Sequence, residues 1–121
     1  MHLGIGVDLI EIERIARAIE RHGELFLSRH FTKREREYCQ TFQNQSERFA
    51  GRFAAKEAIV KAFGTGISEE ISWLDIEILP DERGSPRVSL SERSREHFAF
   101  SHCHLSISHC KTVAIAFAMI E

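Results

Sequence analysis

Residues 52–61, Arg-Phe-Ala-Ala-Lys-Glu-Ala-Ile-Val-Lys, lie within the strongest helix that the sequence predicts. This helix runs from about Ser46, which can cap its start, to Phe63. Gly64 can end the helix in a left-handed conformation. The predicted fold is therefore built around one long helix near the middle of the chain.

Shorter elements are predicted on both sides of this helix. Before it, Leu3–Leu9 reads as a strand, and a helix runs from about Ile12 to Arg21. Thr32 opens another helix, because Thr32-Lys33-Arg34-Glu35 has the form of a capping box. The later elements are strands at 74–79 and 86–90, a helix from Ser91 to about Phe100, and strands at 102–108 and 113–120. This order predicts an α+β fold, a single domain over residues 1–121 in which an antiparallel sheet packs against the long helix.

Composition excludes several classes of protein. The formal net charge is −2 over 121 residues, whereas a dedicated nucleic-acid binder usually has a strong basic excess. The longest apolar stretch, Val113–Ile120, is too short to span a bilayer, and no apolar run before Asp8 resembles a signal peptide. The three cysteines form no disulfide framework. We therefore expect a cytoplasmic protein with no nucleic-acid or membrane partner.

Gly6-Val7-Asp8 places a carboxylate at the end of a buried strand. A strand holds a carboxylate rigidly, and the glycine leaves room for a ligand, so Asp8 is a candidate metal ligand. An isolated Asp at this position could equally cap the helix that follows.

Glu57 continues a line of aromatic residues on the long helix. Phe49, Phe53, Glu57 and Lys61 are spaced four residues apart and share one stripe. A partly buried carboxylate needs a partner, which could be Lys61 or a cation shared with Asp8. The alternative is an ordinary solvent-facing Glu–Lys pair worth about 0.2–0.5 kcal/mol. Two further residues, Arg52 and Lys56, form a neighbouring stripe that could bind phosphate.

Histidines and cysteines gather in residues 102–110, which suggests zinc. The alternation of a strand argues against zinc, because it divides the potential ligands between two faces of the sheet. One face carries His102, His104, Ser106 and Ser108. The other carries Cys103, Leu105, Ile107 and His109. The polar first face is better suited to hydrogen-bonding a ligand.

Together, residues 6–8, 53–61 and 104–109 resemble the phosphopantetheinyl transferases, specifically the short holo-(acyl-carrier-protein) synthase group. Arg52 and the Gly64-Thr65-Gly66 turn are similar to the same group. The resemblance implies transfer of 4′-phosphopantetheine from coenzyme A to a serine of apo acyl carrier protein in fatty acid biosynthesis. Adenosine 3′,5′-bisphosphate would be the second product.

The resemblance also implies a role for each matching residue. Asp8 and Glu57 would bind Mg²⁺, and Lys61 would lie against the transferred phosphate. The serine proton would go to Glu57, directly or through water, or to His104. The residues expected to contact coenzyme A are Arg52, Lys56, Lys61, Gly64, Thr65, Gly66, Pro86, Ser106 and His109.

Members of this group are similar in being homotrimers with active sites at subunit interfaces, which suits a core this small. Their first helix is similar to a docking surface for the acidic carrier. Here Arg14, Arg17 and Arg21 lie three to four residues apart on one side of that helix, although a solvated helix face would look the same.

Three alternatives remain open at this stage. A non-enzymatic nucleotide-binding module would have no use for the Asp8–Glu57 pair. A zinc protein would be built on the ligands of residues 102–110, with Cys110 beside His109. A transferase of the same family could also serve a carrier other than the fatty-acid one.

Overall fold

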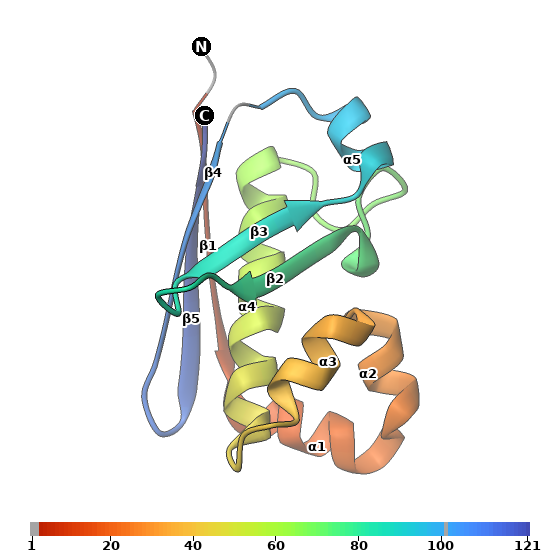
Figure 1. Cartoon of the computed structure of the whole chain (residues 1–121), viewed down its shortest axis with the longest axis vertical. Helices are drawn as coiled ribbons and strands as arrows, with labels where there is room; N and C mark the ends of the chain where they lie inside the picture. Colours follow the sequence, from red (N-terminus) through yellow and green to blue (C-terminus); the bar gives the residue numbers. More distant parts are fainter. Residues whose placement is uncertain (1–2, 101) are drawn as a thin grey trace.

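The computed structural model describes residues 3–100 and 102–121, and it has an α+β fold (Figure 1). The first half is mostly helical and the second half mostly extended. The elements in chain order are β1 (Gly4–Glu11), α1 (Ile12–His22), α2 (Glu24–His30), α3 (Lys33–Cys39), α4 (Gln45–Phe63), the 3₁₀ helix η1 (Trp73–Asp75), β2 (Ile76–Pro80), β3 (Pro86–Leu90), α5 (Glu92–His97), β4 (Cys103–His109) and β5 (Val113–Ile120). Within the described residues, no helix is both long and apolar enough to cross a bilayer.

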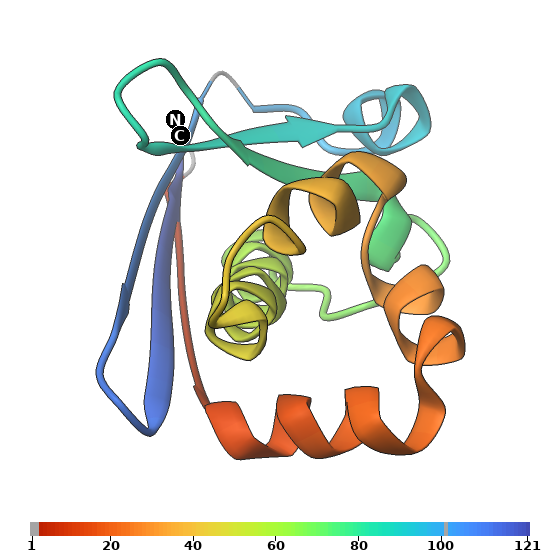
Figure 2. The same ribbon diagram turned by 60° about the horizontal axis from the view of Figure 1, so that its bottom comes forward.

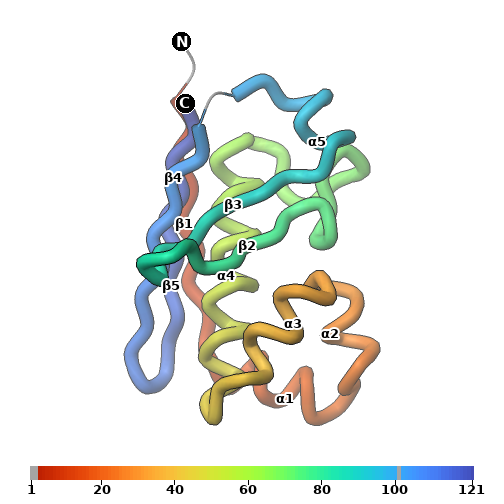
Figure 3. Tube along the Cα trace, viewed as in Figure 1, coloured from red at the N-terminus to blue at the C-terminus, as the bar shows by residue number. Residues whose placement is uncertain are grey.

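Helix α4 is the centre of the molecule. An antiparallel sheet in the order β1-β5-β4 covers one side of it, and the β2–β3 hairpin covers another. Figure 2 looks nearly along α4 and shows helices α1 to α3 closing the remaining side. The tube in Figure 3 shows that β1 and β5, from opposite ends of the chain, run side by side. The predicted sheet packed against a long helix is confirmed.

Small residues let the sheet approach α4 closely. The inward side chains of β5 are Ala114, Ala116 and Ala118, all fully buried. On β1, a Cβ atom added at Gly6 would lie 1.9 Å from the carbonyl oxygen of Ala58. Because no side chain fits there, β1 lies directly against α4, and Asp8 follows two residues after this contact.

Several local predictions are confirmed. Strands β3 and β5 have the predicted bounds, and Thr32 and Glu35 form the reciprocal capping box at the start of α3. Gly64 ends α4 in the left-handed conformation with φ 83°. On β4, Cys103, Leu105 and Ile107 pack against the core while His104, Ser106 and Ser108 are exposed, as strand alternation predicted.

Other local predictions are wrong. Ser46 lies inside α4, whose N-cap is Asn44 without a side-chain capping bond. Helix α2 was missed because its seven residues are too few for a periodic pattern. Leu74 and Asp75 belong to η1 rather than to a strand, because Asp75 Oδ2 accepts from the Ser72 amide at 2.8 Å and closes a tight turn. Helix α5 ends at His97, short of Phe100.

Candidate active site

Asp8 and Lys61 meet where β1 crosses α4. Lys61 Nζ donates to Asp8 Oδ1 at 2.9 Å and to the Val7 carbonyl oxygen at 3.1 Å. Asp8 lies on the side of β1 that faces α4, and its side chain is mostly buried. The alternative that Asp8 caps α1 is excluded, since the N-cap of α1 is Glu11 and makes no side-chain capping bond.

Glu57 lies one helical turn before Lys61 and is partly buried. Burial raises the pKa of the Glu57 carboxyl, the negative charge of Asp8 raises it further, and Lys61 opposes both. The two carboxylates therefore repel each other across a space that Lys61 only partly neutralises. Two neighbouring carboxylates, with the remaining positions open to phosphate and water, are a donor set that suits a hard divalent cation.

The zinc alternative gains no support from residues 102–110. Across the part of the chain that the structure describes, no group of three or more His, Cys, Asp or Glu side chains could hold a metal ion. Burial also raises the pKa of the Cys103 thiol to about 11.

Lys56 does not lie where a phosphate could reach it, so the predicted coenzyme A contact is wrong. The side chain is fully buried. Its ammonium donates to Glu35 Oε1 and the His30 carbonyl, both at 2.7 Å, and to the Trp73 carbonyl at 3.0 Å. We call these four groups the Lys56 cluster. All three ammonium hydrogens have partners, which compensates for removing the charge from water.

Arg52 is also withdrawn from solvent, and only 7% of it is exposed. Its Nε donates to the Ile78 carbonyl at 3.2 Å, and its guanidinium lies 4.7 Å from the centre of the Tyr38 ring. This stripe of α4 faces α3 and β2. The phosphate contact of Arg52 stays a prediction. Sequence reasoning missed Glu35 as the partner of Lys56, because its capping-box pattern already accounted for a carboxylate there.

His104 and Ser106 lie on the far side of the sheet from Asp8. The register pairs Ser106 with Phe117 and His104 with Met119, whose side chains point away from α4. His104 Nε2 lies 2.6 Å from Glu121 Oε2. Asp8 lies on the opposite face and on the opposite edge strand, so His104 and Asp8 do not meet within one chain. His109 points the other way from His104, and its Nδ1 lies 3.9 Å from Glu47 Oε2.

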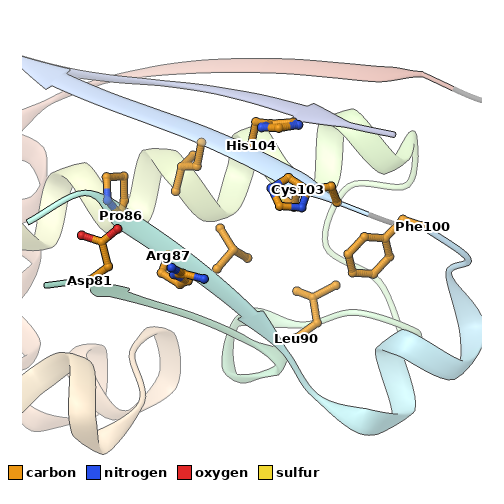
Figure 4. A pocket seen from close by; sticks show the side chains of 10 residues that line it. Asp81, Pro86, Arg87, Leu90, Phe100, Cys103 and His104 are labelled. Atoms are coloured by element: carbon orange, nitrogen blue, oxygen red, sulfur yellow. The ribbon is translucent and has the colours of Figure 1, made fainter. Parts of the chain in front are cut away.

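Pro86 and His104 border a groove of about 460 Å³ between the hairpin and β4. Figure 4 shows Pro86 and Arg87 of β3 on one side of it and Cys103 and His104 of β4 on the other. Strands β3 and β4 do not pair, so the groove runs between two sheet edges. It is separated from Asp8 by the width of the three-stranded sheet.

The Gly64-Thr65-Gly66 turn follows Lys61 at the end of α4 and is open to ligand. Gly64 and Gly66 both have positive φ, and a Cβ added to either would meet no atom within 4 Å. The amides of Thr65 and Gly66 both donate to the Val60 carbonyl, at 3.1 and 3.2 Å. These bonds keep the backbone of the turn close to α4, while the space beside the Cα atoms of Gly64 and Gly66, where a side chain would start, is open.

Asp75, which closes η1 after this turn, gives stability a pH dependence. Burial alone would raise the pKa of Asp75, but hydrogen bonds from Arg93, the Ser72 amide and Ser91 lower it to about 2 from 3.8. The resulting stabilisation is complete above pH 3.8 and is lost as the pH falls through 2. We expect urea unfolding at pH 7 to give a free energy of unfolding about 2 kcal/mol lower for Asp75→Asn than for the unsubstituted protein. At pH 3 this difference in the free energy of unfolding should be about half as large. A difference that does not change with pH would contradict this assignment.

Arg14, Arg17 and Arg21 are all exposed on α1, as the predicted docking surface requires. Arg17 Nη2 lies 3.1 Å from Glu13 Oε1, one turn away on the same helix. A surface pair of this kind contributes little to stability, so Arg17 can exchange Glu13 for another carboxylate at small cost.

Comparison with known proteins identifies the class that this fold and site define. A model of the 4′-phosphopantetheinyl transferase superfamily matches residues 4–118. The protein belongs to this superfamily. It is similar to the holo-(acyl-carrier-protein) synthase of Protochlamydia amoebophila, with 54% identity over 98% of each chain. It is also similar to that of Chlamydia caviae, with 49% identity over 95% of this chain and 93% of the relative.

Solved structures of holo-(acyl-carrier-protein) synthases are also similar to this protein in sequence and fold. The holo-(acyl-carrier-protein) synthase of Helicobacter pylori in complex with coenzyme A is 35% identical, with a TM-score of 0.90 over 97% of this chain and 99% of that one. The Bacillus anthracis protein, in complex with CoA (3′,5′-ADP), is 41% identical, with a TM-score of 0.83 over 97% and 94%. The resemblance drawn from the three motifs is confirmed.

Proposed function

We propose that this protein transfers the 4′-phosphopantetheine group of coenzyme A to a serine of apo acyl carrier protein, in support of fatty acid biosynthesis. The observation that carries the proposal is the meeting of Asp8, Glu57 and Lys61 where β1 crosses α4. Family membership supports the reaction, and the coenzyme A complexes of similar structures support the donor.

The chemistry follows from the positions of these groups. The serine oxygen bonds to the β-phosphorus of coenzyme A, the pyrophosphate P–O bond breaks, and adenosine 3′,5′-bisphosphate leaves. Lys61 Nζ, held at Asp8, offsets negative charge on the transferred phosphate. Glu57, a stronger base than an ordinary glutamate because of burial and Asp8, accepts the serine proton. Asp8 and Glu57 would hold Mg²⁺, which supplies charge neutralisation for the pyrophosphate.

We also propose that the protein forms a homotrimer with its active sites at subunit interfaces. The outer face of the three-stranded sheet exposes a row of large apolar side chains. They are Leu3, Ile5, Val7, Leu9, Ile115 and Phe117. Exposed apolar patches of this kind mark association surfaces. His104 and Ser106 lie on this same outer face, so a second copy that covers it would pack beside them.

Phe117→Asp is expected to give monomers with little transfer activity, because Phe117 lies in the middle strand of this face and is 46% exposed in a single chain. A carboxylate there would be buried without a partner only in the assembly. Light scattering measures the mass. The control is Leu74→Asp, an exposed apolar residue of η1 away from the sheet. A fully active monomer would contradict the shared site.

Arg14→Glu is expected to raise the KM for carrier protein by about three- to tenfold and to leave the KM for coenzyme A unchanged. The reason is loss of attraction between an exposed arginine of α1 and an acidic partner. Steady-state assays with each substrate varied in turn measure this, and Arg83→Glu in the β2–β3 turn is the matched charge reversal. Equal losses for both substrates would indicate damage to the fold instead.

The reaction itself is tested by the intact mass of apo acyl carrier protein after incubation with this protein, coenzyme A and Mg²⁺. We expect a gain of one phosphopantetheine arm per carrier. Folded protein that binds coenzyme A but transfers nothing to any carrier would favour the nucleotide-binding module. A gain on another carrier alone would redirect the assignment within the family. The cytoplasmic location stays a prediction from the sequence.

A further inference from the structure

The loop of residues 64–72, between α4 and η1, has little to fix its shape by itself. Gly64 and Gly66 have positive φ, and a Cβ added at either would meet no atom within 4 Å. The amides of Thr65 and Gly66 hold this first turn to the Val60 carbonyl. One internal backbone bond is present, from the Ser68 amide to the Ile71 carbonyl at 2.9 Å. Ile71 is fully buried and anchors the far end. The middle of the loop therefore depends on contacts from elsewhere in the chain.

Arg93 of α5 supplies the first of these contacts. Its Nε and Nη2 donate to Asp75 Oδ1 at 3.1 Å and to Asp75 Oδ2 at 2.7 Å. Its Nη1 donates to the carbonyl oxygen of Glu69. The planar guanidinium thus joins the middle of the loop to η1 through a two-bond fork and one backbone bond.

Ser94, the next residue, supplies the second contact. Ser94 is fully buried, and its hydroxyl donates to the carbonyl oxygen of Glu70 at 2.9 Å. Helix α5 therefore holds two consecutive carbonyls of the loop. The Phe98 ring, directly after α5, packs at a tilt against Phe63 with ring centres 4.6 Å apart, so the end of α5 contacts the end of α4.

We infer that Arg93 is a positioning residue for coenzyme A, holding the 64–72 loop in the shape that receives the nucleotide next to Lys61. This inference rests on the proposed function. Fixing the loop before binding lowers the ordering cost that the nucleotide would otherwise meet. The guanidinium is directed at Asp75 and Glu69, so its part differs from that of Lys61, whose charge faces the phosphate.

The experiment compares Arg93→Lys and Arg93→Gln with Arg95→Gln, an exposed arginine of the same helix. Calorimetry measures the Kd for 3′,5′-ADP, and steady-state assays measure kcat and the KM for each substrate. We expect both Arg93 variants to raise the Kd for 3′,5′-ADP and the KM for coenzyme A by about tenfold, because lysine keeps the charge but cannot form the fork. The KM for carrier protein and the kcat should change much less, and Arg95→Gln should match the parent.

Three results would overturn the inference. If Arg93→Lys had the same Kd for 3′,5′-ADP and the same KM for coenzyme A as the parent, the positive charge of Arg93 and not its two-bond fork would support nucleotide binding. An unchanged Kd in Arg93→Gln would show that the loop does not need Arg93. Equal losses for coenzyme A and carrier protein would indicate general damage. Failure of the unsubstituted protein to transfer is a separate result, since it rejects the proposed reaction while 3′,5′-ADP binding still tests the loop.

Discussion

Replacing Glu57 by glutamine is expected to lower kcat for phosphopantetheine transfer by about 10²–10⁴-fold. Glutamine keeps the shape of the side chain and removes both its negative charge and its basicity. The carboxyl that Asp8 and burial make more basic then no longer accepts the serine proton, and Asp8 is left as the only carboxylate of the pair. Intact mass of the carrier, followed over time at saturating coenzyme A, measures the rate.

The fold should be unaffected, because Glu57 is only partly buried and its carboxylate is not part of the buried Lys56 cluster. Circular dichroism and urea unfolding check this point. Glu96→Gln, an exposed carboxylate of α5, is the matched change of charge and should retain full activity. Retention of more than about a tenth of the parent rate by Glu57→Gln would place proton transfer elsewhere, with His104 of another copy as the next candidate.

Replacing Lys56 by methionine is expected to lower the free energy of unfolding by about 3–5 kcal/mol. Methionine fills a similar volume but leaves the Glu35 carboxylate fully buried without its cation. It also leaves the His30 and Trp73 carbonyls without a donor. Urea unfolding at one fixed protein concentration measures the loss, since assembly would make stability depend on concentration.

A double variant separates the charge from the packing. Lys56→Met with Glu35→Leu removes both charges and should regain part of the loss. Recovery should be incomplete because Glu35 also accepts from the amides of Thr32 and Ile78, both at 2.8 Å. Lys33→Met, at an exposed position of α3, should change stability by less than about 0.5 kcal/mol. A single variant as stable as the parent would show that the Lys56 cluster contributes nothing.

The contrast between Glu57 and Lys56 shows how far the sequence could be interpreted. Helical spacing correctly placed Glu57 and Lys61 on one stripe and Lys56 on another. Spacing cannot tell which stripe faces solvent, because that depends on elements distant in the sequence. Lys56 meets Glu35, 21 residues earlier, and α3 covers it. When α3 is left out of consideration, a lysine beside a candidate ligand site is interpreted as a phosphate contact.

Strand alternation was more informative. It correctly separated His104 from His109, because a strand has only two faces and Leu105 and Ile107 identify the core side. The same rule could not show that Asp8 and His104 lie on opposite faces of one sheet. That outcome depends on β5 pairing between β1 and β4, which is a contact between the two ends of the chain.

The Lys56 cluster also gives the protein an optical reporter. Trp73 is the single tryptophan of the sequence, and its carbonyl oxygen accepts a hydrogen bond from Lys56 in the cluster. Its ring stacks on Phe53 at a centroid distance of 4.7 Å and meets the His30 ring edge-on at 4.9 Å. An indole packed in this way emits at shorter wavelength than one in water. Unlabelled fluorescence therefore follows the junction of α2, α3 and α4 directly, and a red shift marks the moment when those helices separate.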